Sequence, residues 1–337
     1  MSICKGNLAL CALAIAVHAT VLGCGSAATA RLSAASKPGL AIKDSSSSFP
    51  PKRGDEISRN SSPLPVVIWH GLGDSCCNPD SMGAVKDAIE KSLPGVFVYS
   101  INAAGSGDDD SWNSYFGNVN EQVEAVCGEL SGMEELAGGF NAVGFSQGGQ
   151  FLRAVLERCQ DSSLKMKTLV TMGAQHQGVS SPPGCGDASS CKTAQSLINW
   201  GAYIGWIQKS VVPAQYYKDV DNMEQYLEAS IFLADINNER PAKNSTYAAK
   251  LQELERLVLV RFTKDQTVVP RDSAWFSWWG DDGTMVGMED TPLYKEDWIG
   301  LRALDEAGRV ERMDCEGEHM QFGLDWFVEN IVSPFLS

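Results

Sequence analysis

The sequence has few basic residues, few histidines and, after its first 30 residues, no long apolar run. Its 27 lysines and arginines stand against 42 aspartates and glutamates, which gives a formal net charge of -15. A chain of this charge is poorly suited to bind the phosphates of nucleic acids or anionic lipids, so we expect neither as a main partner. No segment after residue 30 approaches the roughly 20 apolar residues needed to cross a bilayer. We therefore expect no transmembrane segment once the N-terminal signal peptide, described next, has been cleaved.

The N-terminal segment has the layout of a secretory signal peptide. Lys5 precedes an apolar run from Leu8 to Leu22, and small residues at 27–30 offer a cleavage site. Residues 31–62 are rich in serine, alanine, proline and lysine, a composition that predicts a disordered polar leader. We therefore expect a signal peptide at 1–30, a leader at 31–62 and one large α/β domain at 63–337.

The sequence lacks any C-x-x-C pair, the cysteine spacing of many zinc sites, and we expect neither a metal nor a cofactor. Seven cysteines lie after residue 30, and an exported chain with this many is expected to form disulfides. The odd number leaves at least one thiol free. Cys185 and Cys191 are placed to close a loop rich in proline, glycine and serine. The triplets that begin at Asn60 and Asn244 are acceptors for N-glycosylation.

Short runs of apolar and β-branched residues alternate with segments of helical length. The runs predict strands at 66–69, 96–101, 141–145, 167–173 and 257–262. This alternation is typical of a mostly parallel sheet flanked by helices. Residues from about 180 to 250 show no convincing strand and are too many for a plain connection, so we interpret them as a helical cap insertion.

The apolar side chains of this cap have two possible roles. They could pack within the cap, or they could line an apolar cleft for a ligand. Packing is the commoner role for such residues, and both remain open for this set: Trp200, Tyr203, Ile204, Trp206 and Ile207.

The pattern Gly144-x-Ser146-x-Gly148 predicts a nucleophile elbow. A strand precedes it and a helix with apolar residues at helical spacing follows it, as this turn requires. Small neighbours let the chain turn sharply at the serine, and the following helix N-terminus favours developing negative charge. Ser146 is therefore the candidate nucleophile.

A serine needs a base, and only three histidines lie after residue 30. In such hydrolases the chain order is serine, acid, histidine, which His70 fails because it precedes the serine. His176 would need Asp161 as its acid, directly after the nucleophile helix. His319 lies before a final amphipathic segment, where such a base is expected, and is the candidate base.

The acid is expected in a loop after a late strand, between Ser146 and His319. Asp265 follows the last predicted strand by three residues, and Asp272, Asp281 and Asp282 are competitors further on. The oxyanion hole needs two backbone N–H groups. Its candidate donors are Gln147, which follows the nucleophile, and Leu72, in the loop after the first strand.

Several longer segments resemble one family. They are PLPVVIWHGLGDSCCNPDSMGA at 63–84, GFSQGGQFLRAV at 144–155, GAQHQGV at 173–179, SIFLADINNER at 230–240 and EGEHMQF at 316–322. From residue 63 to 336 the chain is similar to the lysosomal palmitoyl-protein thioesterases. The resemblance implies an α/β-hydrolase fold that removes long acyl chains from the cysteines of S-acylated proteins or peptides, with fatty acyl thioesters as substrates.

The resemblance also assigns individual residues. It implies Ser146, Asp265 and His319 as the catalytic triad, with the match at KDQTVVPRDSAWF (264–276) supporting the acid. Leu72 and Gln147 would form the oxyanion hole. Disulfides would join Cys76 to Cys77, Cys127 to Cys159 and Cys185 to Cys191, although adjacent Cα atoms lie closer than most disulfides allow. Cys315 would have no partner.

Residues 102–118 depart from the family pattern, and only Asn244 clearly matches a family glycosylation position. The expected location is the lysosome or a vacuole, with secretion as an alternative. The triad alone does not distinguish a thioesterase from a secreted carboxylester lipase. A third class is a lipid-binding protein that has kept the fold and lost catalysis.

Overall fold

The computed structural model describes residues 63–103, 107–161, 163–181 and 201–337. These residues belong to one compact unit, Pro63–Ser337. The expected signal peptide, the polar leader, Asn60, the pair Cys185 and Cys191, and Trp200 lie outside the described residues.

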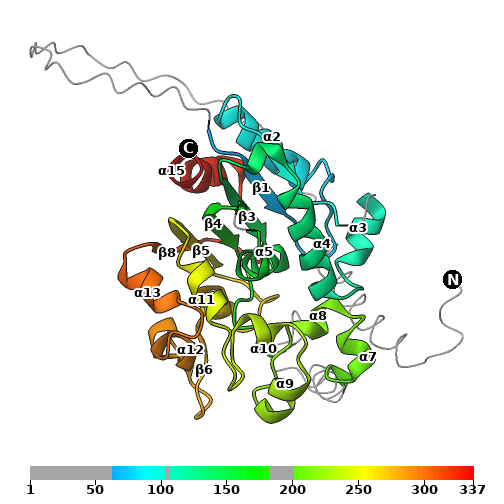
Figure 1. Cartoon of the computed structure of the whole chain (residues 1–337), viewed down its shortest axis with the longest axis vertical. Coiled ribbons are helices and arrows are strands. Elements are labelled where there is room, and N and C mark those ends of the chain that lie inside the picture. The colour runs from blue at the N-terminus through cyan, green and yellow to red at the C-terminus, as the bar shows by residue number, and fades with distance from the viewer. Residues whose placement is uncertain (1–62, 104–106, 162, 182–200) are drawn as a thin grey trace, which may run out of the picture. The chain divides into compact units, whose positions relative to one another are not determined.

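A six-stranded sheet forms the centre of this unit (Figure 1). The strand order is β2-β1-β3-β4-β5-β8, and all five neighbouring pairs are parallel. The strands are β2 (Val98–Ser100), β1 (Val66–Trp69), β3 (Phe140–Phe145), β4 (Met166–Met172), β5 (Arg256–Phe262) and β8 (Val310–Cys315). The predicted α/β class with a mostly parallel sheet is therefore confirmed, and the five predicted strands are present with small differences at their ends.

Strand β8 was not predicted. Its sequence VERMDC is mostly polar, and only its last residue is fully buried. This strand lies at the edge of the sheet, where one partner strand is enough and less apolar surface is covered. A short antiparallel pair, β6 (Trp278–Trp279) with β7 (Met285–Val286), also gave no clear signal.

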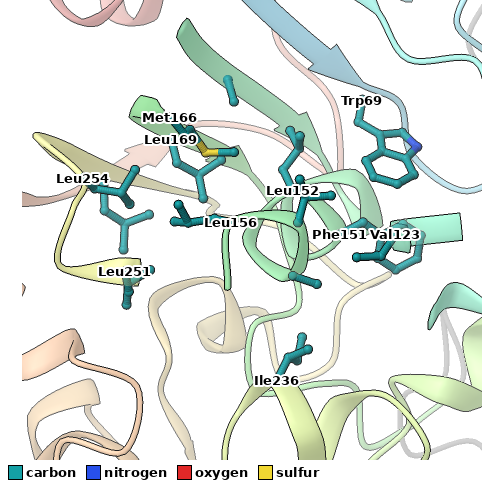
Figure 2. Close-up of a cluster of buried hydrophobic side chains, with 14 of the residues drawn as sticks. Trp69, Val123, Phe151, Leu152, Leu156, Met166, Leu169, Ile236, Leu251 and Leu254 are labelled. Atoms are coloured by element: carbon teal, nitrogen blue, oxygen red, sulfur yellow. The ribbon is translucent and has the colours of Figure 1, made fainter. Parts of the chain in front are cut away.

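Helices cover both faces because successive strand residues point to opposite sides of a sheet. On one face, Val67, Ala142 and Leu169 pack with α4 (Val119–Ser131) and α5 (Gln147–Arg158). Figure 2 shows this cluster, with Phe151 and Leu152 of α5 between the strands and α4. On the other face, Ile68, Val143 and their neighbours pack with α2 (Met82–Ser92) and the C-terminal helices.

The remaining helices are short. Outside the segment between β4 and β5 they are α3 (Gly107–Asn113), α12 (Pro292–Lys295), α13 (Leu301–Glu306), α14 (Leu324–Phe327), a π-helical turn (Val328–Val332) and α15 (Ser333–Phe335). The predicted final helix, at LDWFVENI, thus corresponds to α14 and the π-helical turn after it.

The chain between β4 and β5 contains, in its described part, α7 (Gly205–Gln208), α8 (Val212–Gln215), α9 (Met223–Ala229), α10 (Leu233–Ile236) and α11 (Ser245–Leu251). No named strand occurs among the residues of this segment that the structure describes. Tyr203 and Ile207 are buried, and the Tyr203 ring lies 5.9 Å from that of Tyr217. These two cap residues therefore pack within the protein.

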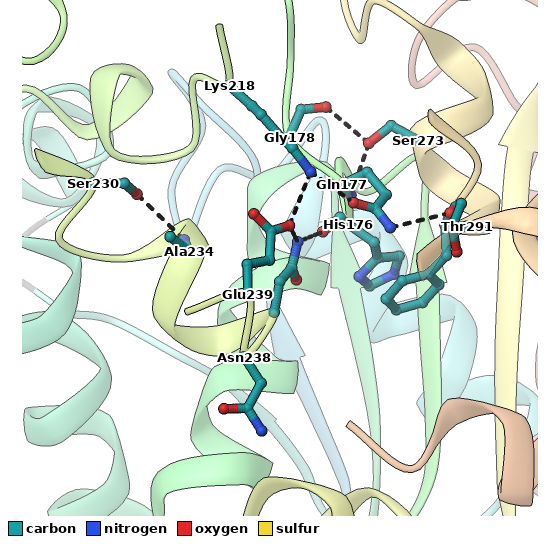
Figure 3. Close-up of polar contacts among 12 residues, drawn as sticks. His176, Gln177, Gly178, Lys218, Ser230, Ala234, Asn238, Glu239, Ser273 and Thr291 are labelled. Atoms are coloured by element: carbon teal, nitrogen blue, oxygen red, sulfur yellow. Dashed lines mark hydrogen bonds and ion pairs between the residues drawn. The ribbon is translucent and has the colours of Figure 1, made fainter. Parts of the chain in front are cut away.

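A buried polar network joins this segment to the sheet (Figure 3). Lys218 Nζ lies 2.9 Å from a carboxylate oxygen of Glu239 and donates to Gln177 Oε1 at 3.1 Å. The backbone N–H of Gln177 donates to Ser273 Oγ, whose hydroxyl donates to the Gly178 carbonyl. These bonds connect the loop after β4, the cap segment and the loop after β5.

Arg153 of α5 makes a second buried connection. It pairs with Glu157 one helical turn later at 2.8 Å, and both side chains are 0% exposed. Its other donors reach Asn237 Oδ1 at 2.7 Å and the Ile236 carbonyl at 3.0 Å. The nucleophile helix is thus tied through one guanidinium to the end of α10.

Candidate active site

Ser146 lies in a strained turn between β3 and α5. Its backbone has φ 53° and ψ -124°, a positive-φ conformation that residues other than glycine rarely adopt. A Cβ atom at Gly144 would overlap the backbone of Gly149, and one at Gly148 would overlap the Trp69 carbonyl. The glycines of the motif are therefore required for space, and the serine is held at the carboxyl edge of the sheet.

Three side chains from distant parts of the sequence form one hydrogen-bonded chain. His319 Nε2 lies 2.9 Å from Ser146 Oγ, and His319 Nδ1 lies 2.6 Å from Asp265 Oδ2. Asp265 follows β5 and His319 follows β8, so neighbouring parallel strands deliver both loops to the same edge of the sheet. The arrangement can pass a proton from the serine to the imidazole.

Both carboxylate oxygens of Asp265 make hydrogen bonds, so the side chain is held in place. Its other oxygen, Oδ1, accepts the backbone N–H groups of Thr267 at 2.8 Å and Val268 at 2.9 Å. The Asp265 side chain is 2% exposed and that of His319 is 13% exposed. The carboxylate is therefore enclosed, while the imidazole lies nearer the surface.

The alternative acids lie elsewhere. Asp272 pairs with Arg261, which also binds Asp314. Asp281 and Asp282 are exposed in the turn between β6 and β7. None of them contacts a histidine among the described interactions.

The alternative bases are both enclosed. His176 is buried, is stacked on Phe276, and contacts Thr171 Oγ1 at 3.0 Å. Burial, followed by the nearby Arg153 charge, holds the pKa of His176 well below its usual value. Asp161 instead accepts bonds from Ser163 on the surface. His70 pairs with Asp110, a contact that was not predicted.

One candidate oxyanion donor follows the nucleophile in the chain, and the other follows a glycine that packs against it. Gln147 is the first residue of α5, where a helix leaves its N–H groups without helical partners. Leu72 follows Gly71, and a Cβ atom added to Gly71 would lie 3.1 Å from the Ser146 Cβ. The Gln147 side chain is engaged elsewhere, since it donates to the Ser114 carbonyl and accepts the Tyr216 hydroxyl.

The structure joins Cys76 to Cys77 and Cys127 to Cys159. The second bond links α4 to the end of α5. Cys315 is a buried free thiol, and burial together with the Glu316 charge raises its pKa to about 11. Asn244 is exposed at the start of α11. Within the described ranges, no cluster of three or more His, Cys, Asp or Glu side chains is arranged to hold a metal ion.

A family model described as palmitoyl protein thioesterase matches residues 65–319. The matched range includes the three hydrogen-bonded residues Ser146, Asp265 and His319. The chain belongs to the palmitoyl protein thioesterase family. It is therefore a hydrolase of the thioesterase class, as the sequence motifs indicate.

Named relatives agree with this assignment. The chain is 47% identical to palmitoyl-protein thioesterase 1 of Caenorhabditis elegans, over 81% of this chain and 91% of that protein. It is 28% identical to a lysosomal thioesterase PPT2 homolog of Drosophila melanogaster, over 73% of this chain and 82% of that protein. Among solved structures, the RedJ thioesterase of Streptomyces coelicolor matches 81% of this chain and 91% of its own at 13% identity, with a TM-score of 0.42.

No helix in the part of the chain that the structure describes is both long and apolar enough to span a membrane.

Proposed function

We propose that this protein releases long-chain fatty acids, palmitate foremost, from S-acylated cysteines of proteins or peptides. The observation that carries the proposal is the hydrogen-bonded chain from Ser146 through His319 to Asp265. Family membership and the named relatives support a thioester as the bond that is attacked.

In the proposed reaction, His319 Nε2 takes the Ser146 proton while the serine oxygen attacks the thioester carbonyl. Asp265 holds the imidazole with its proton on Nδ1 and stabilises the imidazolium that forms. The backbone N–H groups of Leu72 and Gln147 bind the oxyanion of the tetrahedral intermediate. The intermediate collapses to an acyl-Ser146 ester as the cysteine sulfur leaves and takes the proton from His319 Nε2, which frees the thiol and returns the imidazole to its neutral form.

Deacylation uses the same groups. His319 now takes a proton from water, the resulting hydroxide attacks the acyl ester, and Ser146 leaves as the alcohol after regaining a proton from His319. The products are a free fatty acid and the unmodified enzyme. No step needs a metal or a cofactor.

The proposed location is the lysosome, reached after removal of a signal peptide at 1–30. The names of the relatives support it, and so does the exposed position of Asn244, which suits an N-glycan. Detection of the glycan by endoglycosidase sensitivity, with Asn244→Gln as control, tests passage through the secretory pathway.

The direct test measures palmitate release from an S-palmitoylated peptide by the parent and by Ser146→Ala. We expect release by the parent alone. An O-palmitoyl ester of matched chain length distinguishes a thioesterase from a carboxylester lipase. Rapid release from the thioester supports the proposal, and a clear preference for the oxygen ester refutes it. A fluorophosphonate that labels the parent but not Ser146→Ala excludes a non-catalytic binding protein.

A further inference from the structure

His70, in the loop after β1, lies beside the site but outside the proposed triad. Its side chain is 3% exposed and that of its partner Asp110 is 1% exposed. His70 Nε2 lies 3.0 Å from Asp110 Oδ2, and His70 Nδ1 lies 2.9 Å from the Gly71 carbonyl oxygen. Two buried acceptors therefore face the two nitrogens of one imidazole.

This geometry determines the protonation of the ring. A carbonyl oxygen only accepts hydrogen bonds, so Nδ1 must carry a proton to bond Gly71, whereas Nε2 lies 3.0 Å from Asp110 without hydrogen-bond geometry. Burial alone lowers the pKa of His70, but the bond and charge of Asp110, the Gly71 carbonyl and the Asp74 charge together raise it above the usual value. The Asp110 carboxylate, from α3, therefore favours the protonated form of the His70 ring.

The contact with Gly71 has a stereochemical consequence for Leu72. In a trans, planar peptide the carbonyl and the following N–H point in opposite directions. The Gly71 carbonyl and the Leu72 N–H belong to the same peptide group. A donor that fixes the carbonyl therefore fixes the direction of the Leu72 N–H, in a peptide that packs against Ser146.

Helix α3 and the turn after it hold the other side of Leu72 as well. The Gly73 N–H donates to Ser114 Oγ at 2.7 Å, and Ser111 Oγ donates to the Gly73 carbonyl at 2.9 Å. Asp110 Oδ2 also accepts the Cys76 N–H at 2.8 Å. Leu72 thus lies between two points at which its loop is anchored to the segment 110–114.

We propose that His70, paired with Asp110, is a positioning residue of the oxyanion hole, and that its Nδ1–H holds the Gly71–Leu72 peptide with the Leu72 N–H directed at the developing oxyanion. The inference rests on the proposed thioesterase function. A donor on the carbonyl also polarises the peptide and strengthens the Leu72 N–H as a donor.

Two matched substitutions isolate this contact. In His70→Asn, the amide nitrogen can take the place of Nδ1 and donate to the Gly71 carbonyl. In His70→Gln, the longer amide reaches the place of Nε2 near Asp110 and leaves the Gly71 carbonyl without its donor. Both variants replace the imidazole with a neutral amide, so the difference between them reports the Gly71 contact.

The measurement is kcat and KM for release of palmitate from an S-palmitoylated peptide, with thermal unfolding of each variant alongside. We expect kcat of His70→Gln to fall by about 10²-fold, as for a lost oxyanion donor, with KM nearly unchanged. His70→Asn should retain more of kcat than His70→Gln, because it keeps the donor to the Gly71 carbonyl even though it loses the contact with Asp110. Equal kcat values, or a lower kcat in His70→Asn, would overturn the inference.

The parent protein gives a second test if either variant fails to fold. With four histidines in the whole sequence, the ¹⁵N resonances of selectively labelled imidazoles can be assigned individually. At neutral pH Nδ1 of His70 should carry a proton, and Nδ1 without a proton would refute the inference. Absence of palmitate release by the parent would instead refute the proposed function, and this inference with it.

Discussion

Asp265 and Glu157 are two buried carboxylates that each pair with a nitrogen-bearing side chain. They differ in how exposed that partner is. Asp265 accepts three hydrogen bonds, and its partner His319 is 13% exposed with its second nitrogen on Ser146. Glu157 and its partner Arg153 are both 0% exposed, and every group that Arg153 contacts belongs to the protein interior.

The difference in exposure indicates different roles, catalysis for the His319 pair and fold stability for the Arg153 pair. The His319 pair ends at the Ser146 hydroxyl, from which the imidazole can take a proton. The Arg153 pair is closed and connects α5 to the chain beyond α10, so it can only stabilise the fold. Substitutions at the first pair should therefore change rates, and substitutions at the second should change stability.

The largest effect is expected for Ser146→Ala. Removal of the nucleophile should lower kcat by about 10⁶-fold, because the remaining groups cannot form an acyl ester. The free energy of unfolding should change little. Steady-state kinetics together with urea denaturation measure both quantities, and a loss smaller than about 10²-fold would exclude Ser146 as the nucleophile.

Asp265→Asn should lower kcat by about 10⁴-fold. The asparagine can keep Oδ1 on the Thr267 and Val268 N–H groups, which turns its NH₂ toward His319 Nδ1. The imidazole must then carry its proton on Nε2, where it cannot accept from Ser146. Asp272→Asn is the matched control, and comparable losses of kcat in the two variants would contradict the assignment of the acid.

Arg153→Met should destabilise the protein by about 3–5 kcal/mol, because it leaves Glu157 buried without its cation. The variant Arg153→Met with Glu157→Leu should recover most of that loss. Urea denaturation of both measures the coupling, while kcat per folded molecule should stay close to that of the parent. A rate loss as large as that of Asp265→Asn would show that the two regions are not separable.

The smallest effect is a pH dependence. Burial raises the pKa of Glu157 to about 7, and the charge of Arg153 only partly opposes it. The folded state then holds the proton more tightly than the unfolded state. The stability that this provides is complete below the usual glutamate pKa and is lost as pH rises through about 7.

Glu157→Gln removes this titration. The stability of the parent relative to Glu157→Gln should therefore fall by about 3 kcal/mol between pH 4 and pH 8, since one pKa unit corresponds to about 1.4 kcal/mol. Chemical denaturation at several pH values measures the difference. A difference that stays constant, or that grows in favour of the parent with rising pH, would contradict the assignment.

The sequence predicts the central sheet well because buried parallel strands are continuous apolar runs, as in VVIW at β1. It also predicts the serine turn, since the constraints on Gly144 and Gly148 are local. Strand β8 is missed because an edge strand needs fewer apolar residues. Its loop carries His319, which could be selected only because histidines are scarce.

Contacts between distant polar residues could not be predicted. Asp265 is one of several acids in suitable positions, and only the fold turns Asp272 toward Arg261 instead. The pairing of His70 with Asp110 joins the loop after β1 to α3, 40 positions later, and α3 lies in a segment that departs from the family pattern. A polar residue in a loop gives no local sign of whether it will be buried or with which partner.

The central claim is that Ser146 attacks a thioester carbonyl and carries the acyl chain between the two steps. The most direct measurement is intact-protein mass spectrometry after rapid acid quenching of the enzyme with an S-palmitoylated peptide. A palmitoyl adduct on Ser146, absent in Ser146→Ala and formed as the thiol is released, is the predicted result. Thiol and palmitate release without an adduct in the parent, or an adduct on another residue, would contradict the account.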